Sequence, residues 1–162
     1  ALLPEGLDWR WEHIGGGELK AALQAQAAGA GVEARITWRG ACDQPEVIAA
    51  MRESDLFVLP SRVAANGDRD GLPNVLMEAA SQRLPILSTS VAAIPEFITD
   101  GVHGTLTRDT PEALSEAIAS LAADPARADA MAEAALDRLR SEFTLAPGIA
   151  RLTERLSALI AP

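Results

Sequence analysis

The sequence of 162 residues has one cysteine, one lysine and no tyrosine, and only 4% of its residues are aromatic. Cys42 alone cannot form an internal disulfide, and no second Cys or nearby His gives it the spacing of a zinc site. Scarce aromatic residues argue against base-stacking platforms for nucleic acids. No apolar run approaches the roughly 20 residues of a membrane-spanning helix, and no segment has the pattern of a signal peptide. We therefore expect a cytoplasmic protein without structural disulfides.

Positive charge is also scarce. The 14 Lys and Arg residues are outnumbered by 23 Asp and Glu residues, which gives a net charge of −9. Proteins that bind nucleic acids usually present a basic face, so we expect no nucleic-acid partner. Hydrophobic residues make up 48% and charged residues 23%, as in ordinary globular domains, and the length suits one domain spanning residues 1–162.

Short apolar runs alternate with helical patterns along the chain. Strands are predicted at Trp9–Ile14, Arg35–Trp38, Leu56–Leu59, Pro85–Thr89 and Gly104–Leu106. Helices are predicted at Glu18–Ala28, Pro45–Glu53, Asn74–Gln82, Pro111–Ala123, Ala126–Ser141 and Pro147–Ile160. This alternation predicts an α/β domain with a Rossmann-like, doubly wound parallel sheet. Because Leu56–Leu59 is apolar at every position, we expect it to be a central strand covered on both faces.

Ligands of open α/β sheets bind beyond the carboxyl ends of the strands, so the loops after the strands are the places to look for a site. Gly15, Gly16 and Gly17 lie between a predicted strand and a predicted helix, where backbone N–H groups can approach an anion. A simple tight turn explains these glycines equally well. The connection from Pro60 to Pro73 is long for a compact domain, and long loops are often functional.

Two carboxylates lie at the end of that connection and in the helix that follows it. Asp70 lies just before the helix that starts at Asn74, and Glu78 lies in its second turn, so both side chains can face one cleft. On spacing alone the simpler interpretation is favoured, in which Asp70 complements the helix dipole and Glu78 is a solvated charge.

The residues around this pair resemble a known family. The stretch from Asp70 through Glu78 to Ala80 is similar to the acidic-x7-Glu signature of retaining, nucleotide-sugar-dependent glycosyltransferases of family 4, which have the GT-B fold. The similarity continues through Leu84–Ile98, with its Ile-Pro-Glu turn, and Asp100–Gly104. The inserted loop Ala64–Gly71 is similar to that of the branch that builds colanic acid and other bacterial exopolysaccharides. The resemblance covers nearly the whole chain, with its motifs in the family's order.

The resemblance implies a role for each matching residue. Glu78 would accept hydrogen bonds from the ribose hydroxyls of the donor, and Asp70 would hold the hydroxyls of the donor sugar. The segment Gly71, Leu72, Pro73, Asn74 and Val75 would contribute backbone N–H groups that stabilise the departing diphosphate. Arg39, Gly40 and Ala41 would line the base, and Gly15–Gly17 would border the phosphates. Neither a metal ion nor another cofactor is implied.

The resemblance also implies that the chain is the donor-binding half of a larger enzyme. An N-terminal acceptor domain, and the first strand of this domain itself, would lie outside residues 1–162, with an exposed seam beside Trp9–Ile14. Family members usually supply an Arg and a Lys to the diphosphate from the segment after that first strand. Lys20, the only lysine, is predicted to lie inside a helix and to substitute poorly for them. We therefore expect the isolated chain to bind the donor weakly and to be inactive.

The expected partners of the parent enzyme are a nucleoside-diphosphate sugar and a glycan or lipid-linked glycan acceptor, with a peripheral attachment to the inner face of the membrane. Asp70 stands where the family usually has Glu, which leaves a non-catalytic nucleotide-sugar-binding or assembly module as the main alternative. A GT-B sugar epimerase is a further alternative. A receiver domain, a serine hydrolase and a dehydrogenase are excluded because the late Lys, the G-x-S-x-G elbow and the spaced glycine fingerprint are all missing.

Overall fold

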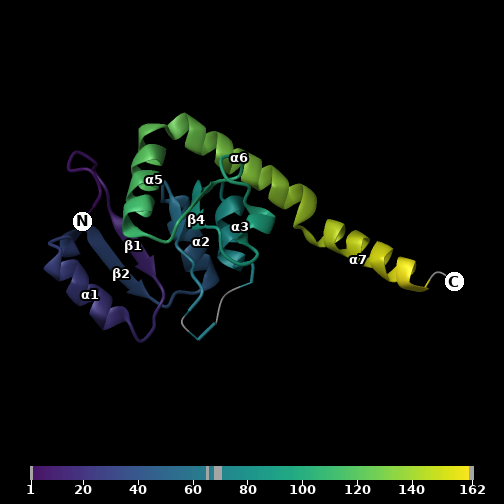
Figure 1. The fold of residues 1–162 in the computed structure, drawn as a ribbon, viewed down its shortest axis with the longest axis horizontal. Coiled ribbons are helices and arrows are strands. Elements are labelled where there is room, and N and C mark those ends of the chain that lie inside the picture. The colour runs from purple at the N-terminus through teal and green to yellow at the C-terminus, as the bar shows by residue number, and fades with distance from the viewer. Residues whose placement is uncertain (1, 65, 68–70, 161–162) are drawn as a thin grey trace.

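The computed structural model describes residues 2–64, 66–67 and 71–160, and Figure 1 shows their arrangement. The strands are β1 (Trp11–Ile14), β2 (Ile36–Gly40), β3 (Phe57–Leu59), β4 (Ile86–Thr89) and β5 (Thr105–Thr107). The helices are α1 (Lys20–Gly29), α2 (Gln44–Arg52), α3 (Asn74–Ser81), α4 (Ile94–Phe97), α5 (Pro111–Ala123), α6 (Pro125–Glu142) and α7 (Leu145–Ile160), with a 3-10 turn η1 (Glu33–Arg35). The α/β class and all five predicted strands are confirmed.

The strands form two parallel sheets rather than one continuous sheet. β1 pairs with β2, and β4 pairs with β3 on one side and β5 on the other. Every pairing is parallel, so the carboxyl ends of neighbouring strands point the same way within each sheet. In Figure 1 the β1–β2 sheet and α1 lie to one side of the three-stranded sheet. The division lies beside β1, where the sequence predicts a seam.

The core is built on β4. All four β4 residues are at most 1% exposed, because helices pack on both faces of this strand. One face carries Ile86, which packs with Leu76 of α3 and Phe97 of α4. The other face carries Leu87, which packs with Leu121 of α5 and other apolar residues of α5 and α6.

The position of β3 differs from the prediction. This strand is the edge of the three-stranded sheet, and its three residues are each only partly buried. Phe57 and Leu59 pack into the cluster around Ile86, and Val58 packs into the cluster around Leu87. Both faces of β3 are therefore covered, as expected, but its outer edge has no neighbouring strand among the described residues.

The chemistry of the predicted helix starts is confirmed in the C-terminal half. The Thr110 side chain accepts a hydrogen bond from the Ala113 N–H, and the Asp124 side chain accepts one from the Arg127 N–H. A proline follows each cap, in the first turn, where its missing N–H costs nothing. The one-turn elements α4 and η1 were not predicted, since they are too short to show a helical period.

Helix α7 extends away from the rest of the domain (Figure 1). A stripe of apolar side chains along it is at least 53% exposed: Leu145, Ile149, Leu152, Leu156 and Leu159. These positions recur every three or four residues and so share one face of the helix. Among the described residues, no helix combines the length and hydropathy that crossing a membrane requires.

Candidate nucleotide-sugar site

The loops that follow β1 and β2 meet at the carboxyl ends of these strands. The Gly15 N–H donates a 2.7 Å hydrogen bond to the Gly40 carbonyl oxygen, which joins the triglycine turn to the Arg39–Ala41 segment. Gly40 has φ = +77°, a conformation that glycine adopts without strain. Gly16 and Gly17 are exposed beside this contact. The structure thus brings together two predicted groups of site residues that are more than twenty positions apart in the sequence.

Lys20 lies at this same junction. It is the first residue of α1, it is partly buried, and its Nζ lies 3.9 Å from where a Cβ atom on Gly40 would be. The sequence predicts Lys20 to lie inside the helix; the helix starts two residues later than predicted, so Lys20 is its first residue. A positive charge at a helix N-terminus is repelled by the positive end of the helix dipole. An anion bound between the charge and the helix end removes this repulsion. Lys20 therefore supplies a positive charge beside the triglycine turn.

Glu78 is held in place by a residue that the sequence did not single out. Gln44 Nε2 donates a 2.8 Å hydrogen bond to Glu78 Oε1. Gln44 is the first residue of α2, whose start is fixed by a reciprocal pair of hydrogen bonds between Asp43 and Glu46. Because α2 follows Gly40 by only a few residues, this hydrogen bond links Glu78 of α3 to the segment that ends β2. Glu78 is partly buried and is not simply a solvated charge.

The start of α3 presents backbone rather than side chains to the site. Leu72 and Val75 both pack against the core cluster, so their side chains point inward. Pro73 is the residue before the helix rather than part of its first turn, and it makes no side-chain hydrogen bond that would cap the α3 N-terminus. Asn74 is exposed in the first turn. The α3 start is thus a helix end whose amide groups are available to an anion.

The predicted partner of Glu78 lies outside the described residues. Asp70 belongs to the stretch 68–70, so its proposed contact with the donor sugar stays a prediction. Gly71, the next residue, is exposed.

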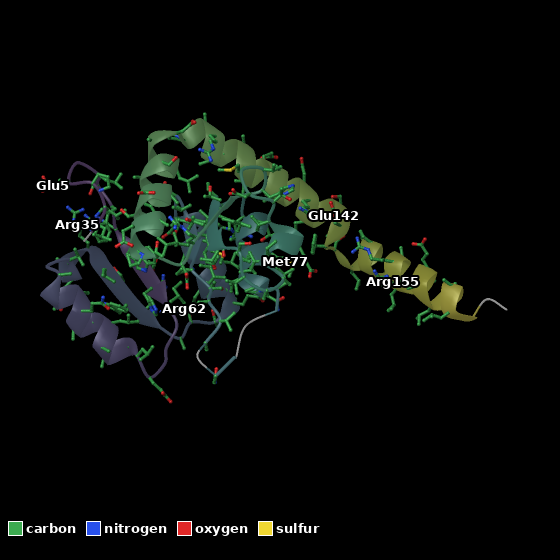
Figure 2. The ribbon with its side chains drawn as sticks, in the orientation of Figure 1. Glu5, Arg35, Arg62, Met77, Glu142 and Arg155 are labelled. Atoms are coloured by element: carbon green, nitrogen blue, oxygen red, sulfur yellow. The ribbon has the colours of Figure 1, made fainter. Side chains whose placement is uncertain are left out.

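Further back in the same connection, Arg62 is exposed three residues after β3 and lies, in Figure 2, at the same end of the molecule as the ends of β1 and β2. Its position shortly after a strand is the sequence signal that could have identified Arg62 as a candidate site residue.

Two buried hydroxyl groups of β4 fix the beginning of that connection. The Ser88 Oγ donates a 2.7 Å hydrogen bond to the Leu59 carbonyl oxygen, and the Thr89 Oγ1 donates one to the Ser61 carbonyl oxygen. Ser88 and Thr89 are at most 1% exposed, and buried hydroxyl groups generally need such partners. The direction in which the chain leaves β3 is therefore set by the end of β4.

Arg39 forms an ion pair with a residue of the neighbouring strand. Its Nη1 lies 2.8 Å from Glu12 Oε1 in an ion pair between β2 and β1. The hydrogen bond to Glu12, together with the negative charge of that residue, raises the pKa of Arg39 above its usual value. The guanidinium is therefore engaged on the surface of the two-stranded sheet.

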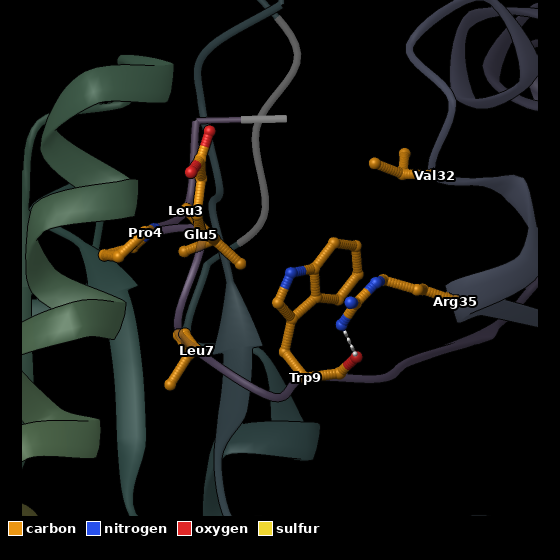
Figure 3. A pocket seen from close by; sticks show the side chains of 7 residues that line it. All are labelled: Leu3, Pro4, Glu5, Leu7, Trp9, Val32 and Arg35. Carbon is orange, nitrogen blue, oxygen red and sulfur yellow. Dashed lines mark hydrogen bonds between the residues drawn. The ribbon is translucent and has the colours of Figure 1, made fainter.

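A hollow of about 130 Å³ lies at the opposite end of these strands (Figure 3). It is lined by Leu3, Pro4, Glu5, Leu7, Trp9, Val32 and Arg35. Trp9 precedes β1 and Arg35 precedes β2, so the hollow lies at the amino ends of the strands. It is separate from the triglycine turn and Gly40, which lie at the carboxyl ends of the strands.

Residues 1–124 match the sequence profile of the family described as glycosyl transferases group 1, which covers most of the chain and all of the site. The chain belongs to the group 1 glycosyltransferases. The family resemblance predicted from the Asp70–Glu78 stretch is thereby confirmed, and the structural neighbours of this glycosyltransferase chain have the GT-B fold.

Similar proteins build bacterial polysaccharides. The chain is 36% identical over 120 residues to the amylovoran biosynthesis glycosyltransferase AmsK of Erwinia amylovora, covering 74% of this chain and 29% of that protein. It is 32% identical over 128 residues to a putative colanic acid biosynthesis glycosyltransferase, WcaL, of Salmonella typhimurium, covering 79% and 31%. The structure of Anabaena HepE in complex with UDP-glucose superimposes with a TM-score of 0.79 at 21% identity, covering 96% of this chain and 42% of HepE. This glycosyltransferase chain therefore spans about a third of the length of these curated relatives.

Proposed function

We propose that this chain is the donor-binding half of a retaining glycosyltransferase. The parent enzyme transfers a sugar from a nucleoside-diphosphate sugar to a glycan or lipid-linked glycan during bacterial exopolysaccharide biosynthesis. The observation that carries the proposal is the Gly15–Gly40 hydrogen bond at the carboxyl ends of β1 and β2, in a chain of this family. Lys20 lies beside Gly40, and the Gln44 that hydrogen-bonds to Glu78 follows Gly40 closely in the sequence.

Glu78 binds the ribose in this proposal. An ionised carboxylate offers two acceptor oxygens, and a vicinal diol offers two donors at a matching separation. Gln44 occupies one lone pair of Oε1 and orients the carboxylate, so the remaining acceptor positions face the ligand without rotating freely. The main chain of Arg39–Ala41, shortly before Gln44 in the sequence, hydrogen-bonds to the edge of the base.

The diphosphate is held by positive potential rather than by a metal ion. Lys20 supplies one full charge beside Gly40, and the uncapped start of α3 supplies aligned amide groups. Negative charge grows on the diphosphate as the bond to the sugar breaks, so these groups stabilise the transition state more than the ground state. The acceptor hydroxyl oxygen then bonds to the oxocarbenium-like sugar on the face from which the diphosphate leaves, and the hydroxyl proton passes to the departing diphosphate. Asp70 orients the sugar hydroxyls during this step.

The acceptor is bound by another domain of the parent polypeptide. The chain covers less than a third of AmsK and of WcaL, which leaves most of each relative for further structure. The exposed apolar stripe of α7, defined above by Leu145–Leu159, is where we place the contact with that domain. Burying these five side chains would remove a large apolar surface from water.

Calorimetry of the 162-residue chain with UDP, GDP and their glucose and mannose derivatives tests the donor site. We expect one nucleotide to bind, with the Glu78→Ala variant binding at least about tenfold more weakly because a charge-assisted pair of hydrogen bonds is lost. Glu116→Ala is the matched control, since Glu116 is an exposed carboxylate on α5. Equal affinity of Glu78→Ala and wild type would overturn the assignment of the site.

Activity of the full-length parent separates the proposal from its alternatives. A labelled donor should be converted to a glycoside in the presence of a glycan acceptor. Binding without transfer or donor hydrolysis would instead identify a nucleotide-sugar-binding module, and release of a free epimerised sugar would identify an epimerase.

A further inference from the structure

We infer that the imidazole of His13 is a further phosphate-binding group of the donor site and donates a hydrogen bond from Nε2 to the diphosphate. This inference rests on the proposed function, because it assigns one more contact to the same ligand. His13 is the third residue of β1 and lies two positions before the triglycine turn, Gly15–Gly17.

The His13 ring lies against the triglycine turn. A Cβ atom on Gly15 would be 3.8 Å from His13 Cε1, the ring carbon between the two nitrogen atoms. The Gly15 N–H donates to the Gly40 carbonyl oxygen, and Lys20 Nζ lies 3.9 Å from where a Cβ atom on Gly40 would be. His13 and Lys20 therefore lie next to the two partners of one hydrogen bond, the former on β1 and the latter at the start of α1.

Trp38 orients the imidazole. His13 and Trp38 are paired residues of β1 and β2, and their ring centroids are 4.9 Å apart with the ring planes inclined at 44°. Aromatic rings at this separation attract each other, so the contact restricts rotation of the imidazole. Glu12 and Arg39, the neighbours of this pair along the strands, form their ion pair on the other face of the sheet.

The two strands change register directly after this pair. His13 pairs with Trp38, but the next residue of β1, Ile14, pairs with Gly40. Arg39 is therefore an extra residue on β2. An extra residue of this kind bends a strand and redirects its side chains, and such irregularities are frequent next to ligand sites. Here it brings Gly40 opposite the end of β1, where the triglycine turn begins.

The surroundings of Nδ1 decide which nitrogen of His13 carries the proton. Nδ1 is buried and has no hydrogen-bond partner among the described residues. A buried N–H group that lacks an acceptor is rarer in folded proteins than a buried acceptor that lacks a donor. A neutral imidazole carries its proton on only one nitrogen, so the favoured tautomer has the proton on Nε2. The Nε2–H group is then the donor that a ligand at the turn can use.

A diphosphate is the part of the donor that suits this group. The imidazole N–H, the Lys20 ammonium and the backbone N–H groups of the exposed Gly16 and Gly17 are all hydrogen-bond donors. Phosphate oxygens only accept hydrogen bonds, whereas ribose hydroxyls need an acceptor such as the carboxylate of Glu78. His13 therefore contacts the diphosphate and not the ribose.

Nitrogen-15 NMR of the two histidine rings tests the contact directly. His103 is the only other histidine of the sequence, and it precedes β5 at the amino end of that strand, so it serves as an internal control. In the free chain we expect the His13 proton on Nε2. Addition of UDP or GDP should shift the Nε2 resonance of His13 and leave that of His103 unchanged. A proton on Nδ1 of free His13, or bound nucleotide without a shift specific to His13, would overturn the inference.

Two substitutions separate phosphate binding from packing. His13→Gln keeps an N–H donor near the position of Nε2, whereas His13→Phe keeps a ring against Trp38 without any donor. We expect His13→Phe to bind UDP or GDP about fivefold more weakly than wild type, and His13→Gln to bind nearly as well as wild type. The urea midpoints should have the opposite order, because the phenyl ring packs better against Trp38. Affinities that follow the urea midpoints would indicate a packing role and contradict the inference.

Uridine and guanosine show which part of the donor is affected. His13→Phe should bind these nucleosides as wild type does, since they have no phosphate, and an equal loss for nucleoside and diphosphate would also count against the inference. Glu78→Ala separates this inference from the proposed function. If Glu78→Ala weakens nucleotide binding and His13→Phe does not, the inference fails while the donor site stands. If neither UDP nor GDP binds the wild-type chain, both fail.

Discussion

The side-chain amide of Gln44 lies 2.8 Å from a carboxylate oxygen of Glu78 and ties the first residue of α2 to the second turn of α3. These two residues are 34 positions apart. The hydrogen bond orients the carboxylate that we assign to the ribose, and it connects the two halves of the site.

Replacing Gln44 should weaken nucleotide binding in a graded way. Gln44→Ala removes one orienting hydrogen bond, worth roughly 1 kcal/mol, and should raise the Kd about fivefold. Gln44→Glu places a second negative charge against Glu78 and should weaken binding further. Calorimetry at neutral pH measures both variants. Equal affinities for Gln44→Ala and Gln44→Glu would contradict an ionised Glu78 at this position.

Lys20 should contribute to phosphate binding and not to base binding. Lys20→Met keeps the length of the side chain but removes its charge, and we expect about tenfold weaker binding of a nucleoside diphosphate. The affinity for the nucleoside itself should not change. Arg35→Met is the matched control, because it removes a positive charge at the amino ends of the strands, where Arg35 contacts Trp9 and Asp8. A similar loss in both variants would indicate a general effect of net charge.

His103 should make the domain less stable in acid. Its Nδ1 accepts a hydrogen bond from the Thr99 N–H at 3.2 Å and lies 3.2 Å from Arg138 Nη1. Burial lowers the pKa of His103 and the positive charge of Arg138 lowers it further, although Glu142 acts in the opposite direction. The folded state thus binds fewer protons than the unfolded state. The stability contribution is fully present above the unfolded pKa of about 6.5 and is lost as the pH falls through the folded pKa.

Urea unfolding at about pH 7.5 and about pH 5 measures this dependence. The wild type should lose more free energy of unfolding between the two pH values than His103→Gln, because glutamine at position 103 does not titrate. An identical loss in the two proteins would assign the acid sensitivity to other groups.

Gly104 should be intolerant of any side chain. A Cβ atom there would lie 2.7 Å from the Ile86 carbonyl oxygen, a backbone atom that cannot move without distorting β4. Gly104→Ala should therefore destabilise the domain by about 2 kcal/mol or more, through overpacking. Gly101→Ala is the control, because its Cβ would meet nothing within 4 Å and only the positive φ of +72° opposes it. Thermal unfolding should rank Gly104→Ala clearly below Gly101→Ala, and the reverse order would contradict the close contact.

Local patterns predicted most of the elements because their causes lie within a few residues. The caps at Thr110 and Asp124 hydrogen-bond to amides three positions ahead, and their predicted roles are confirmed. The glycines of the triglycine turn, the carboxylate of Glu78 and the family signature were equally visible along the chain. The start of α1 was predicted two residues early, so Lys20 is the first residue of the helix rather than a residue inside it, and its Nζ lies near Gly40.

The sequence by itself determined the α/β class, the positions of the strands and the family, since periodicity, capping and motif spacing are properties of neighbouring residues. Tertiary structure alone decided that β3 lies at an edge, that Gln44 orients Glu78, and that Lys20 lies beside Gly40. An apolar run shows that both faces of a strand are covered, but it does not show whether another strand lies beside it. The partner of a strand edge or of a carboxylate is chosen by the folding of distant segments, and no local pattern encodes that choice.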